Sequence, residues 1–164
     1  MESISSEKLQ IVWHTLSKIE LAISRLQERT AVIKSVDDFL LSPSGMEKLD
    51  AACMVLIAIG ESVKNLDKIT NGTLLPTYPS IPWKRVMGMR DVIAHHYFDV
   101  DAEVVFEVIT KEIAPLKAAI ETFKGRPAFR RNGSLGFGSL RFRLHVAGNS
   151  DGEIGRRFRS YEGL

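Results

Sequence analysis

The chain has 164 residues, of which 45% are hydrophobic and 26% are charged, and its formal net charge is +2. These values indicate one globular domain of ordinary size and exclude a chain that is disordered throughout. The single cysteine, Cys53, excludes an intramolecular disulfide framework, and its apolar neighbours predict a buried thiol rather than a nucleophile.

Charge is distributed unevenly along the chain. Residues 1–125 carry 14 Lys and Arg against 17 Asp and Glu, a net of −3, whereas residues 126–164 carry 8 Arg against 3 acidic residues, a net of +5. The first part therefore lacks the charge of a general nucleic-acid-binding domain. We expect residues 1–125 to form the folded domain and residues 126–164 to form an irregular or disordered Arg/Gly-rich tail. Apolar residues and arginines alternate over residues 140–146 as in an amphipathic strand, and such an arm could bind RNA phosphates. A tail without a role is the other alternative.

No targeting or membrane segment is expected. The N-terminus lacks a basic segment followed by an apolar one, which argues against a signal peptide. The longest apolar run, residues 51–60, is about half of what spans a bilayer. We therefore expect a cytoplasmic protein that does not enter the membrane.

Apolar residues that recur every three or four positions predict helices with one buried face. The first helix is expected over residues 6–29, followed by its continuation or a short helix within 30–41. A break is expected at 42–45, where Ser44 and Glu47 suggest a capping box and Pro43 is also compatible with a first helical turn. The next helix is expected over 46–68, with its middle buried nearly all round. Glu61 follows that apolar middle and is either a carboxylate on the exposed edge or a partner of Arg90 or Lys64.

The second half of the domain begins with a proline-rich loop over residues 70–82. A helix is expected from Pro82 to about Phe98. Lys84 and Arg85 lie in its first turn, where they are either solvated charges or contacts for a phosphate. Asp99 and Asp101 open a last helix, which we expect to be kinked by Pro115.

The segment 89–97 places a guanidinium, a carboxylate, two imidazoles and a phenol on one otherwise apolar helix. Helical spacing puts Arg90 and Tyr97 nearly above one another and makes Asp91 a neighbour of His95. His96 falls on the opposite side, which predicts a core position shared with Met89, Val92 and Ile93. The other arc mixes apolar and functional residues, as expected beside a two-fold interface, and comprises Trp83, Val86, Arg90, Ala94 and Tyr97.

The chemistry open to this segment is narrow. The chain has no glycine-rich phosphate loop, paired Cys-x-x-Cys, His-Glu-x-x-His or nucleophile elbow. An imidazole (His95) can transfer a proton at neutral pH, a guanidinium (Arg90) can stabilise a phosphoryl transition state, and Asp91 could fix the imidazole's tautomer. This set suits metal-free RNA cleavage by the ribose 2′-hydroxyl, with the second histidine supplied by a two-fold dimer. A structural salt bridge in a helical core is the competing interpretation.

The motif R-x4-H-x-Y at residues 90–97 resembles that of HepT-like toxins in the HEPN superfamily, over about residues 5–124. The flanking segments agree as well: Ile59-Gly60-Glu61, Ile81-Pro82-Trp83, Gly88-Met89 and Phe98-Asp99-Val100-Asp101. The resemblance implies an all-α antiparallel bundle of four to five helices that dimerises around the motif. It also implies a metal-independent ribonuclease that inhibits growth and is paired with an MntA-type nucleotidyltransferase antitoxin, which adds AMP to the motif tyrosine.

Carried over to this chain, the resemblance implies that Arg90 and His95 are catalytic and that Tyr97 is the AMPylated residue. Asp91 and His96 would support them, RNA would be the substrate, and no metal or other cofactor is implied. Two alternatives stay open: a non-catalytic HEPN dimer that binds a nucleotidyltransferase, nucleotides or RNA, and a plain helical interaction module. The basic tail departs from the usual pattern, in which the chain ends soon after the last helix.

Overall fold

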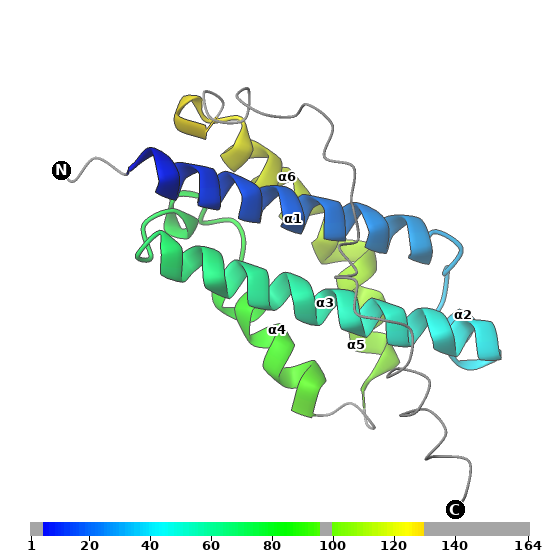
Figure 1. Cartoon of the computed structure of the whole chain (residues 1–164). Coiled ribbons are helices and arrows are strands. Elements are labelled where there is room, and N and C mark those ends of the chain that lie inside the picture. Colours follow the sequence, from blue (N-terminus) through cyan, green and yellow to red (C-terminus); the bar gives the residue numbers. More distant parts are fainter. Residues whose placement is uncertain (1–4, 96–99, 130–164) are drawn as a thin grey trace, which may run out of the picture.

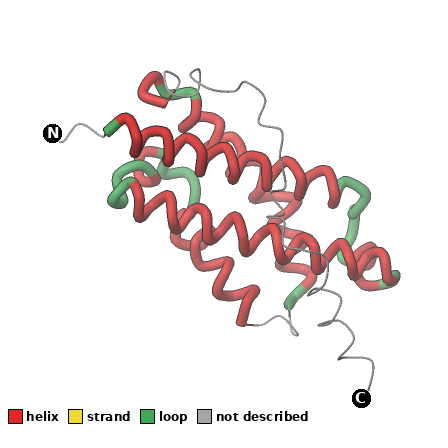
Figure 2. Tube along the Cα trace, viewed as in Figure 1, coloured by secondary structure: helices red, strands yellow, loops and turns green. Residues whose placement is uncertain are grey.

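The computed structural model describes residues 5–95 and 100–129. This part of the chain is all-α, as predicted, with no strand and with six α-helices (Figures 1 and 2). Their bounds are α1 Ser6–Thr30, α2 Asp37–Leu40, α3 Pro43–Ile69, α4 Trp83–His95, α5 Ala102–Glu107 and α6 Ile113–Lys124. A 3-10 turn, Leu75–Thr77, interrupts the predicted loop, and a π segment, Val108–Glu112, joins α5 to α6.

The two long helices α1 and α3 run in opposite directions and form the centre of the bundle (Figure 1). The last helix, α6, packs against α1, whereas α4 packs against α3. The core between them consists of side chains with almost no exposed surface, including Leu16, Ile23, Leu56, Ile59 and Phe123. The helices predicted from the spacing of apolar residues, and the all-α antiparallel bundle implied by the resemblance, are confirmed.

The starts of the long helices follow from their capping residues. Ser5 Oγ accepts a hydrogen bond from the Lys8 N–H, and Ser42 Oγ accepts one from the Gly45 N–H at 3.0 Å. Proline suits the first helical position because its φ is fixed and it has no N–H to leave unpaired, so the serine before Pro43 becomes the cap. The predicted capping box at Ser44 is therefore wrong, and α3 begins three residues earlier than expected.

Helix α4 is anchored to the core by its first residue. The Trp83 ring stacks on Phe123 of α6, with centroids 5.8 Å apart, and its indole N–H donates to the Tyr78 carbonyl at 2.9 Å. Trp83 and Val86 are both buried within the chain, so they leave little surface for a partner, and the two-fold interface predicted beside them stays a prediction. The prediction of a core position for Val92 is wrong, because 60% of this residue is exposed.

The kink predicted at Pro115 takes the form of the π segment. Proline cannot donate to the carbonyl four residues before it, here that of Lys111, and its ring would clash with that carbonyl in a regular helix. The chain widens just before this point, where the Ile113 N–H donates to the Val108 carbonyl five residues back. We attribute the π segment to this proline.

Two further predictions concern the remaining chain. Cys53 is buried, as predicted, and burial together with the nearby Asp50 carboxylate raises the pKa of its thiol to about 11.

Phe129 is buried in the core cluster, so the packed domain includes at least this residue beyond residue 125. Residues 130–164, with the predicted strand-like stretch, lie outside the described residues. No helix in the described ranges combines the length and apolar character needed to cross a membrane.

Candidate active site

The site is centred on Arg90, which lies in the third turn of α4 and faces α3. Its Nη1 donates a hydrogen bond to Asp91 Oδ1 at 2.9 Å, and its Nε lies 3.2 Å from Glu61 Oε2 on α3. All three side chains are about half exposed, at 43%, 49% and 57% for Arg90, Asp91 and Glu61. Arg90 is thus held between two carboxylates at the surface, and Glu61 has Arg90 rather than Lys64 as its partner.

Gly60 brings α3 and α4 close together at the level of Arg90. A Cβ atom at this position would lie 3.0 Å from the Val86 carbonyl oxygen and 3.3 Å from both the Cβ and the backbone nitrogen of Arg90. A side chain here would therefore require α4 to shift away from α3 by a few tenths of an ångström. Because Gly60 directly precedes Glu61, the same turn of α3 provides both the close approach and the carboxylate.

His95 is the last described residue of α4 and is exposed. Within the described residues it forms no hydrogen bond or ion pair, and Asp91 bonds Arg90 instead of the imidazole. The predicted role of Asp91 in fixing the tautomer of His95 is therefore not seen; a hydrogen bond to a full positive charge is stronger than one to a neutral ring. His96 and Tyr97 lie outside the described residues.

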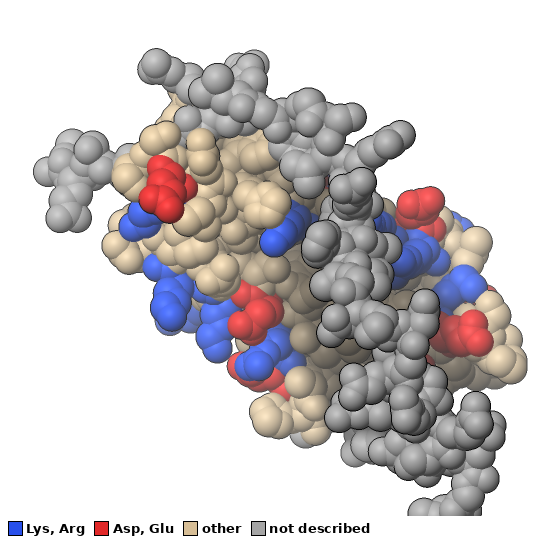
Figure 3. Space-filling view, viewed as in Figure 1, with Lys and Arg blue, Asp and Glu red and all other residues tan. Residues whose placement is uncertain are grey.

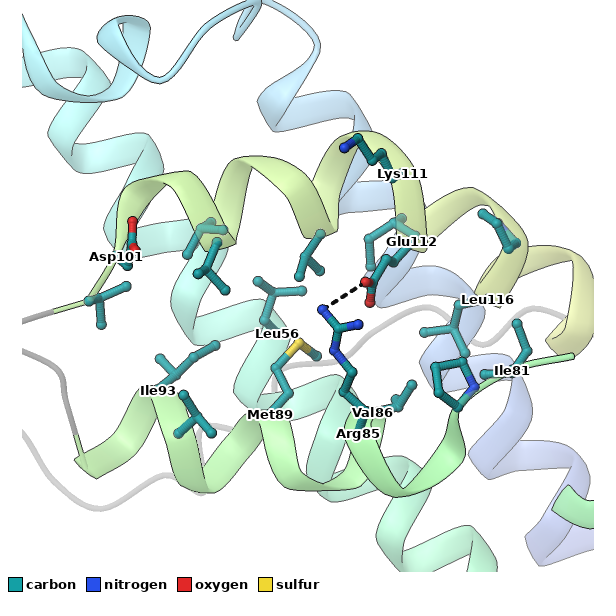
Figure 4. A pocket seen from close by; sticks show the side chains of 18 of the residues that line it. Leu56, Ile81, Arg85, Val86, Met89, Ile93, Asp101, Lys111, Glu112 and Leu116 are labelled. Atoms are coloured by element: carbon teal, nitrogen blue, oxygen red, sulfur yellow. Dashed lines mark ion pairs between the residues drawn. The ribbon is translucent and has the colours of Figure 1, made fainter.

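A groove of about 640 Å³ runs along the neighbouring face of α4 (Figure 4). Its other side is formed by α5, the π segment and α6, residues 102–124, which we call the α5–α6 arm. The lining of the groove is mainly apolar and includes Leu56 at its floor, with Met89 and Val92 on α4. Arg85 crosses the groove to form an ion pair with Glu112 at 3.0 Å. Arg85 and Lys84 were predicted as phosphate contacts, and both are exposed, but Arg85 is already paired with Glu112.

Charge around the site is mixed. On the face shown in Figure 3, basic and acidic side chains lie next to one another instead of forming a large patch of one sign. Among residues 5–95 and 100–129, no group of three or more His, Cys, Asp or Glu side chains is arranged to hold a metal ion. The functional groups in the described part of the site are therefore the guanidinium of Arg90, held by two carboxylates, and the exposed imidazole of His95, one to two turns further along α4.

Comparison with known proteins identifies the family. The sequence profile described as ribonuclease HepT-like matches residues 19–123. The chain belongs to this family. It is 33% identical over 108 residues to a Caldanaerobacter subterraneus protein named "Putative RNase", a match that covers 66% of this chain and 86% of that protein. It is 31% identical over 109 residues to the "Probable ribonuclease HepT" of Thermococcus cleftensis, covering 66% and 92%.

A third relative shows the same domain within a longer protein. The chain is 35% identical over 107 residues to a Methanocaldococcus jannaschii protein named "Gamma-glutamylcyclotransferase and putative RNase", but the match covers only 43% of that protein. No solved structure matches the chain significantly. Membership of the HepT-like family confirms the resemblance found in the motif.

Sequence reasoning left Glu61 out of the predicted site residues but kept a partnership with Arg90 as one of its two alternatives, which the ion pair confirms. The signal that could have placed it there is its position: it directly follows Gly60 and a buried run of α3, and a charged residue at the edge of a buried helix needs a partner. Helical spacing predicted Asp91 as a neighbour of His95, and it left open whether Glu61 pairs with Arg90 or Lys64.

Proposed function

We propose that this chain is a metal-independent endoribonuclease toxin that cuts RNA with Arg90 and His95. The observation that carries the proposal is the guanidinium of Arg90 on α4, held between Asp91 of the same helix and Glu61 of α3. The exposed His95 lies on the same helix, in a chain of the ribonuclease HepT-like family. An exposed imidazole can transfer a proton and a half-exposed guanidinium can stabilise the negative charge of the transition state, so the two groups suit RNA cleavage without a metal.

The reaction follows from the chemistry of these groups. Within the described residues, the contacts of Arg90 occupy Nε and one Nη1 hydrogen, so Nη2 is left to donate to a phosphate oxygen. One imidazole removes the proton of the ribose 2′-hydroxyl, whose oxygen then attacks the adjacent phosphorus. The bond from phosphorus to the 5′-oxygen breaks, and a second imidazole protonates that oxygen. The products are a 2′,3′-cyclic phosphate and a 5′-hydroxyl.

A homodimer would supply the second imidazole. The described part of one chain offers only His95 at this site, whereas the reaction benefits from both a base and an acid. Val92, on the turn before His95, and Val104, on the opposite side of the groove, are 60% and 49% exposed. Exposed apolar residues beside a site support an interface at this face, in place of the buried Trp83 and Val86.

Regulation is proposed to act on Tyr97. A cognate MntA-type nucleotidyltransferase would join the Tyr97 oxygen to the α-phosphorus of ATP, with loss of the phenolic proton and release of pyrophosphate. Helical spacing, as predicted from the sequence, would place Tyr97 close to Arg90, so the added phosphate would compete with RNA for the guanidinium. Tyr97→Phe removes the acceptor oxygen, so this variant should cut RNA and stay active when the nucleotidyltransferase and ATP are added.

The proposal is tested with purified, unmodified protein incubated with RNA in EDTA. We expect cleavage products that end in a 2′,3′-cyclic phosphate, and we expect Arg90→Ala and His95→Ala to lower the rate by at least about 100-fold. Arg25→Ala, at an exposed position on α1, is the matched control and should keep full activity. If unmodified wild-type protein neither cuts RNA nor slows growth, the ribonuclease proposal is wrong and the non-catalytic dimer is favoured.

A further inference from the structure

We propose that Glu61 is a positioning residue for Arg90, and that its negative charge also weakens the binding of RNA. This inference rests on the proposed ribonuclease function and concerns the same site. The two effects act in opposite directions, so one side chain would set both the orientation of the guanidinium and the affinity for the substrate phosphate.

Glu61 is the contact that ties the guanidinium to the rest of the bundle. Asp91 is adjacent to Arg90 on α4, so this carboxylate moves together with the helix that carries the arginine. Glu61 belongs to α3 and reaches the Nε atom, the guanidinium nitrogen closest to the backbone. Contacts at Nε and Nη1 from two different carboxylates restrain both the rotation and the direction of the planar group. The remaining edge of the guanidinium is then presented in one direction.

Gly60 sets the distance over which Glu61 acts. Because the backbone of α4 approaches Gly60 closely, the Arg90 backbone lies directly over the turn of α3 that carries Glu61. The glutamate therefore reaches Nε although its own side chain is more than half exposed. A side chain at residue 60 would lengthen this reach, so the glycine and the glutamate form one unit.

The charge of Glu61 opposes the substrate. Two carboxylates surround one guanidinium, so the cluster of Glu61, Arg90 and Asp91 has a net charge of −1. An RNA phosphate that approaches Arg90 meets this net negative charge at a surface where salt screens it only in part. Glutamine has nearly the same shape as glutamate and keeps an oxygen that can face Nε, but it lacks the charge.

The two roles are separated by comparing Glu61→Gln with Glu61→Ala. We expect Glu61→Gln to keep kcat within about twofold of wild type and to lower KM by about two- to fivefold, a gain that shrinks as salt is added. We expect Glu61→Ala to lower kcat by about 10- to 100-fold, because a misplaced catalytic group loses rate on this scale. Glu47→Gln and Glu47→Ala, at an exposed glutamate near the start of α3, are the matched controls and should resemble wild type.

A readout that does not depend on cleavage distinguishes this inference from the proposed function. In nitrogen-15 NMR spectra, the Arg90 Nε–H signal should keep its wild-type position in Glu61→Gln and move or broaden in Glu61→Ala. The Kd for a DNA oligonucleotide, which lacks the attacking 2′-hydroxyl, should fall in Glu61→Gln. If wild type is inactive but these two results hold, only the proposed function fails. If Glu61→Ala leaves kcat and the Nε–H signal unchanged, or if Glu61→Gln loses as much kcat as Glu61→Ala, the positioning role is overturned.

Discussion

The packing of α4 on α3 can be measured with two identical substitutions, Gly60→Ala and Gly88→Ala. An added Cβ at Gly60 would lie 3.0 Å from the Val86 carbonyl oxygen, which is closer than the ordinary contact distance of about 3.5–4.0 Å. An added Cβ at Gly88 would meet nothing within 4 Å. Both glycines lie inside helices, so both substitutions gain about 1 kcal/mol of helix propensity.

The difference between the two variants isolates the cost of overpacking. The atom in the way at Gly60 belongs to the backbone of α4, so the helix itself must shift, at a cost of about 1–3 kcal/mol. We therefore expect Gly88→Ala to raise the free energy of unfolding by about 1 kcal/mol. Gly60→Ala should leave it unchanged or lower it by up to about 2 kcal/mol, so the two variants should differ by about 1–3 kcal/mol.

The measurement is urea unfolding followed by far-ultraviolet circular dichroism, with both variants and wild type at one protein concentration. Equal m-values would show that the unfolding transition itself is unchanged. If Gly60→Ala gains as much stability as Gly88→Ala, α4 does not approach α3 as closely as described. In that case the distance argument for Glu61 would lose its support as well.

Two further predictions concern titratable groups away from the site. Backbone N–H groups of Lys34 and Ser35 donate to Asp38 and hold the pKa of its carboxyl below the usual value of 3.8. The Asp38 carboxylate therefore stabilises the fold at pH values above 3.8, and this contribution is lost as the pH falls through the lower pKa of the folded state. The urea midpoints of wild type and Asp38→Ala should differ at pH 7 and converge in acid. With a thiol pKa of about 11, Cys53 should react with a disulfide reagent at pH 8 only after unfolding; rapid labelling of the folded protein would contradict its burial.

The sequence predicted the helices well because their signals are local. Apolar spacing predicted α1, α3, α4 and the α5–α6 arm, and Pro115 predicted the distortion between α5 and α6. The errors arose where a neighbouring helix decides the outcome. Val92 has an apolar side chain at core spacing, yet it is exposed because α5 stands across a groove instead of packing on that face of α4.

The same distinction applies to the site. Helical spacing made Asp91 a neighbour of His95, yet Asp91 bonds Arg90 instead, and the partner choice of Glu61 depends on how closely α3 and α4 pack. Trp83 was placed at an interface because a helical wheel shows which residues share a face, but not which neighbour covers that face. The stack of Trp83 on Phe123 joins residues 40 positions apart, which no local pattern encodes.

That stack has a consequence for the order in which the protein is made. The helix that carries Arg90 and His95 is anchored at its first residue by Phe123, close to the end of the last described helix. Chains emerge from the ribosome beginning at the N-terminus, so α4 is available well before its anchor is. While residues 113–124 are still inside the ribosome, Phe123 is not available to stack on Trp83, so α4 cannot yet pack as it does in the finished protein. The site is therefore assembled only after the last helix of the bundle has been synthesised.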